Sequence, residues 1–203
     1  MKYKLRTDLT KIVFGVTFFR IELLIDTKFA SKGLLGGWIE KESNLSQHGD
    51  AWVYGNALVS GNATVYGNAT VSDNATVYGN ALVSGNALVS GNPLVYGNAL
   101  VYGNALVSGN ARVYGNALVY GNATVSGNAS VETLQECINV IIDAKHSITV
   151  TKNHIQIGCE FHTIDHWRKN IKNIGKANGY QKFEIQAYTS ILNGILKLRN
   201  FPK

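Results

Sequence analysis

The sequence predicts a mainly β protein built around a parallel β-helix of four to five coils. Three observations predict it: a valine every six residues, an alternating Ala-x-Val-(Tyr/Ser) pattern around each valine, and a Gly-Asn pair that follows almost every one. The valines stand at positions 53, 59, 65, 71, 77, 83, 89, 95, 101, 107, 113, 119, 125 and 131. A short period held over so many phrases is typical of a solenoid.

Each six-residue phrase combines a short strand with a corner. The alternation of small, exposed, aliphatic and exposed positions is that of a strand with one buried face. Glycine and asparagine both adopt positive φ at low cost, which suits a tight corner. Three such sides close one coil, so each valine should lie on the valine eighteen residues later. Asp73 replaces one corner glycine and is tolerable there, whereas Pro93 replaces an alanine and is expected to remove one ladder donor.

The outward positions divide into three sides of the prism. One side carries a column of serines, a second carries a column of tyrosines, and a third carries tyrosines beside leucines. These columns are Ser72, Ser90, Ser108 and Ser126; Tyr78, Tyr96 and Tyr114; and Tyr66, Leu82, Leu100, Tyr102, Leu118 and Tyr120. An outward stripe of leucine and tyrosine is larger than a monomer usually exposes, so we predict that the third side is an oligomer interface. The alternative, that the aromatic ladders only stabilise the sheet, stays open.

Composition divides the chain into an N-terminal cap (1–50), the repeat (51–131) and a C-terminal module (132–203). In the cap, residues 2–6 and 11–26 have strand patterns, and Gly15 splits the second into a hairpin. A solenoid needs such a lid because its first coil exposes apolar side chains and strand edges. We expect Gly36-Gly37 to form a sharp turn, and Trp38 and Ile39 to plug the prism.

The C-terminal module should contain three short strands, at 136–143, 147–152 and 154–161, followed by two helices. Thr163 is the expected N-cap of the first helix, with Asp165 in its first turn and Gly179 at its end. The second helix should run from about 182 to 199. The apolar stripes of the two helices are Ile164, Trp167, Ile171 and Ile174, and then Ile185, Tyr188, Leu192 and Ile195.

The chain has 19 basic and 13 acidic residues, and its positive charge gathers after His162. Arg168, Lys169, Lys172 and Lys176 on the first helix are therefore a candidate binding surface for an acidic protein or an anionic nucleotide. Nucleic acid is not the expected partner, because a basic helical run is more often a solvated face.

Cysteine usage and hydropathy indicate a cytoplasmic protein. Cys137 and Cys159 provide no disulfide framework, which is typical of a reducing compartment. No signal peptide is evident, and the apolar run 12–25 contains Arg20 and Glu22 and is shorter than the roughly 20 residues that a membrane helix needs. We therefore expect no membrane association.

Two sets of motifs resemble known families. The aliphatic residue with a small residue four positions later, as in Val53 and Ala57, resembles the hexapeptide motif of left-handed parallel β-helices. The flanks resemble hexapeptide-repeat proteins of phages and prophages. The flanking motifs are Gly36-Gly37-Trp38-Ile39-Glu40, Asn44-Leu45-Ser46-Gln47 and the run from Ile157-Gly158-Cys159 to Trp167. The resemblance implies left-handed coils, a homotrimer, and a phage-type scaffold or binding protein that interferes with a host protein or sequesters a nucleotide signal in the host cytosol.

The repeat lacks the residue that the enzymes of this fold need. Many left-handed β-helix proteins are trimeric acyltransferases with a histidine base between subunits. The five histidines, at positions 48, 146, 154, 162 and 166, all lie outside the repeat. We therefore predict no catalytic residue. An acyltransferase-like enzyme and a virion structural protein remain the alternatives.

One group of residues has the spacing of a zinc site. Cys159, His162 and His166 form Cys-x2-His-x3-His, residue types and separations that zinc accepts. No fourth ligand is apparent in the sequence. The ordinary interpretation, a thiol at a strand end and two histidines beside a helix start, is therefore preferred, and we expect no metal or cofactor.

Overall fold

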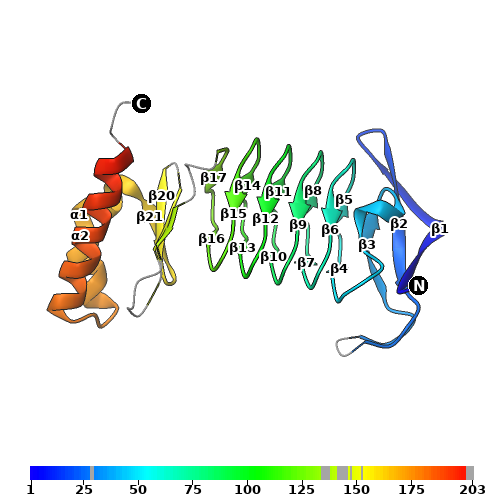
Figure 1. The fold of residues 1–203 in the computed structure, drawn as a ribbon, viewed down its shortest axis with the longest axis horizontal. Coiled ribbons are helices and arrows are strands. Elements are labelled where there is room, and N and C mark those ends of the chain that lie inside the picture. The colour runs from blue at the N-terminus through cyan, green and yellow to red at the C-terminus, as the bar shows by residue number, and fades with distance from the viewer. Residues whose placement is uncertain (28–29, 134–137, 141–145, 147, 152, 200–203) are drawn as a thin grey trace.

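The computed structural model contains three parts along one long axis: the N-terminal cap, the coils and the C-terminal module (Figure 1). It describes residues 1–27, 30–133, 138–140, 146, 148–151 and 153–199. Within these residues, no helix has the length and apolar character required to cross a membrane.

The coils contain fourteen two-residue strands, one for each valine of the repeat. They are β4 (Trp52–Val53), β5 (Leu58–Val59), β6 (Thr64–Val65), β7 (Thr70–Val71), β8 (Thr76–Val77), β9 (Leu82–Val83), β10 (Leu88–Val89), β11 (Leu94–Val95), β12 (Leu100–Val101), β13 (Leu106–Val107), β14 (Arg112–Val113), β15 (Leu118–Val119), β16 (Thr124–Val125) and β17 (Ser130–Val131). All fourteen valines are 0% exposed. The prediction of an interior column of valines is therefore confirmed.

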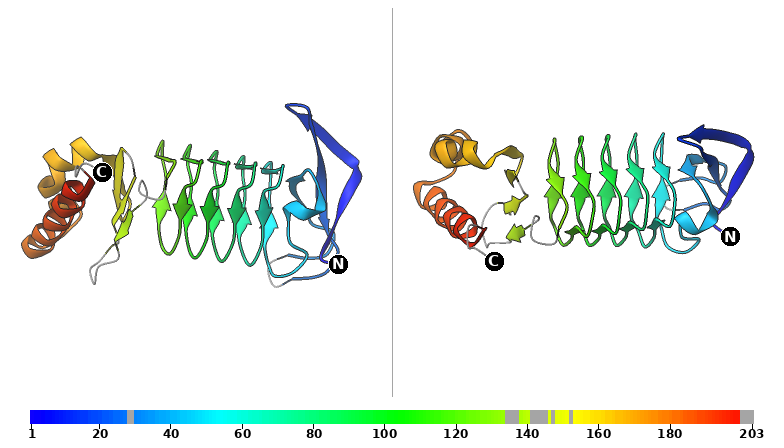
Figure 2. Two further views of the ribbon diagram at one scale, coloured as in Figure 1. Left: turned by 45° about the horizontal axis from the view of Figure 1, so that its top comes forward. Right: turned by 90° about the horizontal axis from the view of Figure 1, so that it is seen from above.

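Every third strand pairs in parallel, which produces the three sides of the prism. Sheet A contains β5, β8, β11, β14 and β17, sheet B contains β6, β9, β12 and β15, and sheet C contains β4, β7, β10, β13 and β16. Val89 pairs with both Val71 and Val107, so the eighteen-residue stacking is confirmed. Figure 2 shows the coils stacked at regular intervals in two further views. The left-handed sense stays a prediction from the resemblance.

The corners are fixed by backbone and side-chain ladders. Corner glycines such as Gly85 and Gly103 have φ between +60° and +90°, as the sequence predicts. At all three corners, each asparagine Nδ2 donates to the Oδ1 of the asparagine eighteen residues later, at 3.0–3.4 Å. Asp73 adopts φ +60°, and its carboxylate accepts the Gly91 N–H at 2.8 Å.

Pro93 differs from the expectation in one respect. The ladder bond of its strand is intact, because Leu94 N donates to Ala111 O at 2.9 Å. The N–H that proline lacks is the one that closes the corner in other coils, where Ala75 N, for example, donates to Ser72 O at 3.1 Å. Pro93 therefore removes a corner bond and leaves the parallel ladder complete.

The N-terminal cap extends sheet A beyond the first coil. It contains β1 (Tyr3–Val13), β2 (Val16–Leu23), β3 (Leu35–Ile39) and the short 3-10 helix η1 (Glu42–Asn44). β1 and β2 form the expected hairpin, whose turn residues Phe14 and Gly15 have φ of +49° and +79°. β2 pairs antiparallel with β3, which pairs in parallel with β5. The first strand is longer than predicted and runs through residues 7–10, where the register shifts between Arg6 and Thr10.

The prediction of a sharp turn at Gly36-Gly37 was wrong. Both glycines lie within β3 and are buried there. A Cβ on Gly36 would lie 2.5 Å from Ile21 Cγ1, and one on Gly37 would lie 2.6 Å from Val53 Cγ1. They are needed because β3 packs closely over the end of the prism. Ile39 plugs the prism at 0% exposure, as expected. Trp38 instead faces outward, with Lys11 Nζ 4.5 Å and Arg20 Cζ 4.9 Å from its ring.

The C-terminal module places one sheet and two helices against the last coil. Its elements are β18 (Ile138–Val140), β19 (Ile148–Val150), β20 (His154–Ile157), β21 (Glu160–Thr163), α1 (Ile164–Ala177) and α2 (Lys182–Arg199). The predicted strand at 154–161 is in fact the hairpin β20–β21, because Gly158 adopts φ +59° and reverses the chain. The first predicted strand, 136–143, lies mostly outside the described residues.

Both faces of this sheet are covered. Ser126 Oγ donates to Gln156 Oε1 at 2.9 Å, and Phe161 packs against the buried residues of the coils. The helices lie on the other side (Figure 2), where Ile155 and Trp167 share a core with Tyr188. Thr163 caps α1 as predicted, with its Oγ1 accepting from His166 N at 3.2 Å. The module therefore closes the end of the prism with the sheet and exposes the helices.

Candidate functional site

Sheet B carries an uncharged outward surface of leucine and tyrosine side chains. Leu82, Leu100 and Leu118 pair directly across β9, β12 and β15, and the Tyr102 and Tyr120 rings stack at 5.7 Å. We call the following six residues the tyrosine–leucine flank: Tyr66, Leu82, Leu100, Tyr102, Leu118 and Tyr120. Ser84, which is only 6% exposed, interrupts the tyrosine column between Tyr66 and Tyr102. The leucine column of the predicted third side is therefore continuous, and its tyrosine column is broken at Ser84.

The other two sides are less apolar. Sheet A carries stacked Tyr78, Tyr96 and Tyr114, with ring centroids 4.9 and 5.1 Å apart, but this column lies beside Arg112. Sheet C carries the predicted serine column. Six large apolar side chains of the coils are exposed, and the flank contains four of them: Tyr66 (40%), Leu100 (38%), Tyr102 (38%) and Tyr120 (50%). The flank is thus the side of the coils with most apolar area open to water.

The basic residues predicted as a binding surface all lie on α1. Arg168, Lys169, Lys172 and Lys176 are all exposed and extend over about 12 Å of helix axis at 1.5 Å per residue. Arg168 Nη1 pairs with Asp165 Oδ1 at 3.4 Å. The apolar stripe of α1 packs against the core on the opposite face. Lys169, Lys172 and Lys176 are therefore oriented away from the module, whereas Arg168 lines a groove between α1 and α2.

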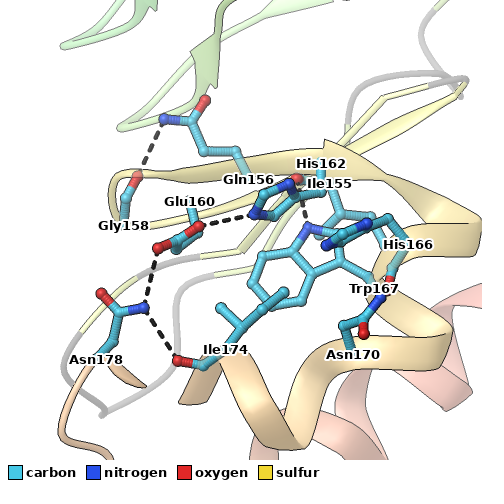
Figure 3. Close-up of polar contacts among 10 residues, drawn as sticks. All are labelled: Ile155, Gln156, Gly158, Glu160, His162, His166, Trp167, Asn170, Ile174 and Asn178. Atoms are coloured by element: carbon cyan, nitrogen blue, oxygen red, sulfur yellow. Dashed lines mark hydrogen bonds and ion pairs between the residues drawn. The ribbon is translucent and has the colours of Figure 1, made fainter. Parts of the chain in front are cut away.

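A second polar cluster joins β21 to the C-terminal end of α1 (Figure 3). Glu160 Oε2 is 2.7 Å from His162 Nε2, and Glu160 Oε1 accepts from Asn178 Nδ2 at 2.9 Å. These hydrogen bonds, that of Asn178 first and that of His162 second, lower the pKa of the Glu160 carboxyl. The His162 ring stacks on His166 at 4.4 Å and meets the edge of Trp167 at 5.6 Å. The carboxylate is therefore held ionised at neutral pH beside an aromatic group.

The zinc spacing does not produce a ligand set in this part of the structure. Cys159 lies exposed at the β20–β21 turn, His162 is on β21 and His166 is on α1. Among the described residues, no three His, Cys, Asp or Glu side chains gather closely enough to hold a metal ion. Sequence reasoning missed Asn178 and Glu160 as partners. The i, i+2 spacing of Glu160 and His162 would have placed them on one face, had β21 been recognised as a separate strand.

Comparison with known proteins identifies the repeat. A family model described as "YdcK Beta solenoid repeat" matches residues 51–67, 59–73, 65–79, 71–85, 95–109, 105–120, 111–127 and 117–132. The matched stretches of the coils are therefore similar to this beta solenoid repeat. The stretch 86–94, which these YdcK-type matches omit, contains Pro93. They do not extend to the flanking motifs on which the phage resemblance depends. No curated protein matches the chain.

Proposed function

We propose that this chain is a non-enzymatic scaffold whose YdcK-type coils self-associate through the tyrosine–leucine flank into a homotrimer. One observation carries the proposal: four of the six exposed large apolar side chains of the coils lie on this one uncharged side. Contiguous apolar area of this kind marks an interaction surface, and aromatic residues are enriched where protein interfaces are buried. The resemblance to trimeric hexapeptide-repeat proteins supports three copies.

Placing two lysines on the flank should therefore separate the subunits. Leu100→Lys with Tyr102→Lys puts two cations where apolar side chains would be buried, and burying unpaired charge is costly. We expect light scattering after size exclusion to report three times 22.1 kDa for the wild type and 22.1 kDa for the variant.

The coils provide a matched control. Leu88 on sheet C and Tyr78 on sheet A are 38% and 37% exposed, the same residue types at nearly the same exposure as Leu100 and Tyr102. Leu88→Lys with Tyr78→Lys adds the same charge and should leave the trimer intact. A wild-type protein that stays at single-chain mass at micromolar concentration contradicts the proposal, as does equal dissociation of both variants.

We infer that the scaffold acts by presenting the basic face of α1 to an anionic partner. In a phage or prophage setting, this partner would be a host protein or a small nucleotide signal in the cytosol. Three observations support this inference: the clustering of Arg168, Lys169, Lys172 and Lys176 on α1, their exposure, and the net charge of +6. A convergent set of cations attracts phosphates over about a Debye length. The coils contain no histidine, the base expected in enzymes of this repeat type, so binding rather than turnover is the activity proposed.

Charge reversal on α1 tests this binding. A nucleotide at about 100 times its Kd stabilises a protein by about 2.7 kcal/mol, which raises Tm by about 5–10 °C for a chain of this length. We expect one member of a panel of nucleoside triphosphates and cyclic dinucleotides to produce such a rise, and Lys169→Glu with Lys172→Glu to abolish it.

A control variant changes the net charge by the same amount as Lys169→Glu with Lys172→Glu, but on a different helix. Lys182 and Lys197 are exposed on α2, and replacing both with glutamate should preserve the rise in Tm. Loss of the rise in both variants would indicate a general charge effect, and the absence of any rise across the panel would exclude nucleotide sequestration.

A further inference from the structure

A pocket opens within the C-terminal module, between the β20–β21 turn and the two helices. Its volume is about 60 Å³, several times the 10–15 Å³ or so that one water centre needs. Gly175 lets the helices approach here, since a Cβ on it would lie 2.7 Å from Ile185 Cγ1. The apolar part of the lining includes Ile157, Trp167, Ile171, Ile174, Tyr180, Ile185 and Tyr188. The pocket is therefore a mostly apolar and aromatic site, as small-molecule sites usually are.

Among the described residues that line this pocket, Glu160 supplies a carboxylate and His146 an imidazole. Asn178 and His162 each occupy one oxygen of the carboxylate, at 2.9 and 2.7 Å. A carboxylate has about four acceptor sites, so both oxygens can accept further bonds. The cations of α1 do not compensate it, because Lys172 and Lys176 lie on the opposite face of the helix from Ile171 and Ile174. The pocket consequently combines aromatic faces with a fixed negative charge.

Several donors that line the pocket already have acceptors. Trp167 Nε1 donates to Ile155 O at 2.8 Å, and Tyr188 Oη donates to His146 O at 2.7 Å. Asn178 Nδ2 donates to Glu160 Oε1 and to Ile174 O at 3.0 Å. Burial raises the pKa of Tyr180 to about 12, so its phenol stays neutral. The pocket therefore attracts a donor or a cation more strongly than an anion.

We propose that this pocket binds a small organic cation, an amine with a compact apolar or aromatic body. The ammonium group would bond to the Glu160 carboxylate, as charge-assisted hydrogen bonds are the strong ones. The body would lie against Trp167 and Tyr180, whose ring faces also attract cations. The proposal concerns the module alone and holds whether or not the coils form a trimer.

The Cys159 thiol provides the readout, because it is exposed and lines the pocket. In a Cys137→Ser variant, the rate at which iodoacetamide alkylates Cys159 is measured at fixed pH and at increasing concentrations of benzylamine. When the benzylamine concentration is twice its Kd, mass action predicts that alkylation is about threefold slower. Benzyl alcohol, which has the same ring without the charge, should leave the rate unchanged.

Glu160→Gln removes the charge while keeping a side chain that can bond to Asn178, and it should abolish the protection by benzylamine. Circular dichroism verifies that the variant is folded, and ligand-observed NMR of benzylamine with wild-type protein gives a second measurement. Equal protection by benzyl alcohol and benzylamine, protection that persists in Glu160→Gln, or no protection and no NMR binding would each overturn the proposal.

Discussion

Replacing Val89 with aspartate is expected to unfold the coils. Val89 is 0% exposed and pairs with Val71 and Val107 on either side. An aspartate there must either ionise in a dry column or take up a proton, and the column supplies no partner for it. We expect the free energy of unfolding to fall by at least about 5 kcal/mol, which is comparable to the entire stability of many domains. Urea denaturation followed by circular dichroism measures it.

The adjacent residue is the matched control for this change. Leu88 belongs to the same strand but is 38% exposed, so Leu88→Asp should cost less than about 1 kcal/mol. If Val89→Asp yields no folded protein, the free energy of unfolding can still be measured for Val89→Ala. It should fall by about 2–3 kcal/mol, because this change removes two buried methyl groups and leaves a cavity. Similar stabilities for Leu88→Asp and Val89→Asp would mean that Val89 is not in a common interior.

The coils were predictable because one six-residue phrase specifies all of their levels of structure. The valine period determines the buried column, and Gly-Asn determines the corner. Counting eighteen residues then determines which outward residues become neighbours, such as Tyr78 and Tyr96, whose rings stack at 4.9 Å. The candidate flank follows from the same count, so its residues could be named before any coordinates. Its role as an interface stays a prediction.

The caps were less predictable because their contacts join segments without a common period. Gly36 and Gly37 have the composition of a turn, yet their small size serves the close packing of β3 against Ile21 and Val53. Likewise, alternation through Ile155, Ile157 and Cys159 concealed the reversal at Gly158. A local pattern indicates a strand but does not show what packs against it.

The pocket could not have been found from the sequence at all. It brings together the β20–β21 turn, the face of α1 from Trp167 to Gly175 and the first half of α2. Glu160 and Asn178 are eighteen residues apart in the chain, and only the packing of α1 against the sheet makes them neighbours. Pockets that depend on such packing have no fixed residue spacing. The zinc-like spacing of Cys159, His162 and His166 shows the converse, since a suitable spacing did not produce a ligand set among the described residues.

Replacing Gly103 with valine is expected to be the most damaging change that leaves the buried column untouched. Gly103 has φ +76°, and a Cβ on it would lie 2.8 Å from Gly121 N, a backbone atom of the next coil that cannot move alone. Left-handed backbone costs an L residue about 1–2 kcal/mol, and crowding against a packed neighbour adds about 1–3 kcal/mol. We therefore expect thermal denaturation to show a Tm lower by about 4–20 °C.

The chain itself suggests the control for this corner. Asp73 occupies an equivalent position at φ +60°, and its carboxylate accepts the Gly91 N–H at 2.8 Å. Gly103→Asp places the same Cβ against Gly121, but it can form the same bond to the Gly121 N–H and aspartate tolerates the left-handed region. This variant should therefore lose about 2 kcal/mol less than Gly103→Val. A valine at 103 as mild as the aspartate would show that the next coil yields to a Cβ. In that case neither the positive φ nor the spacing between coils would be what requires glycine at this corner.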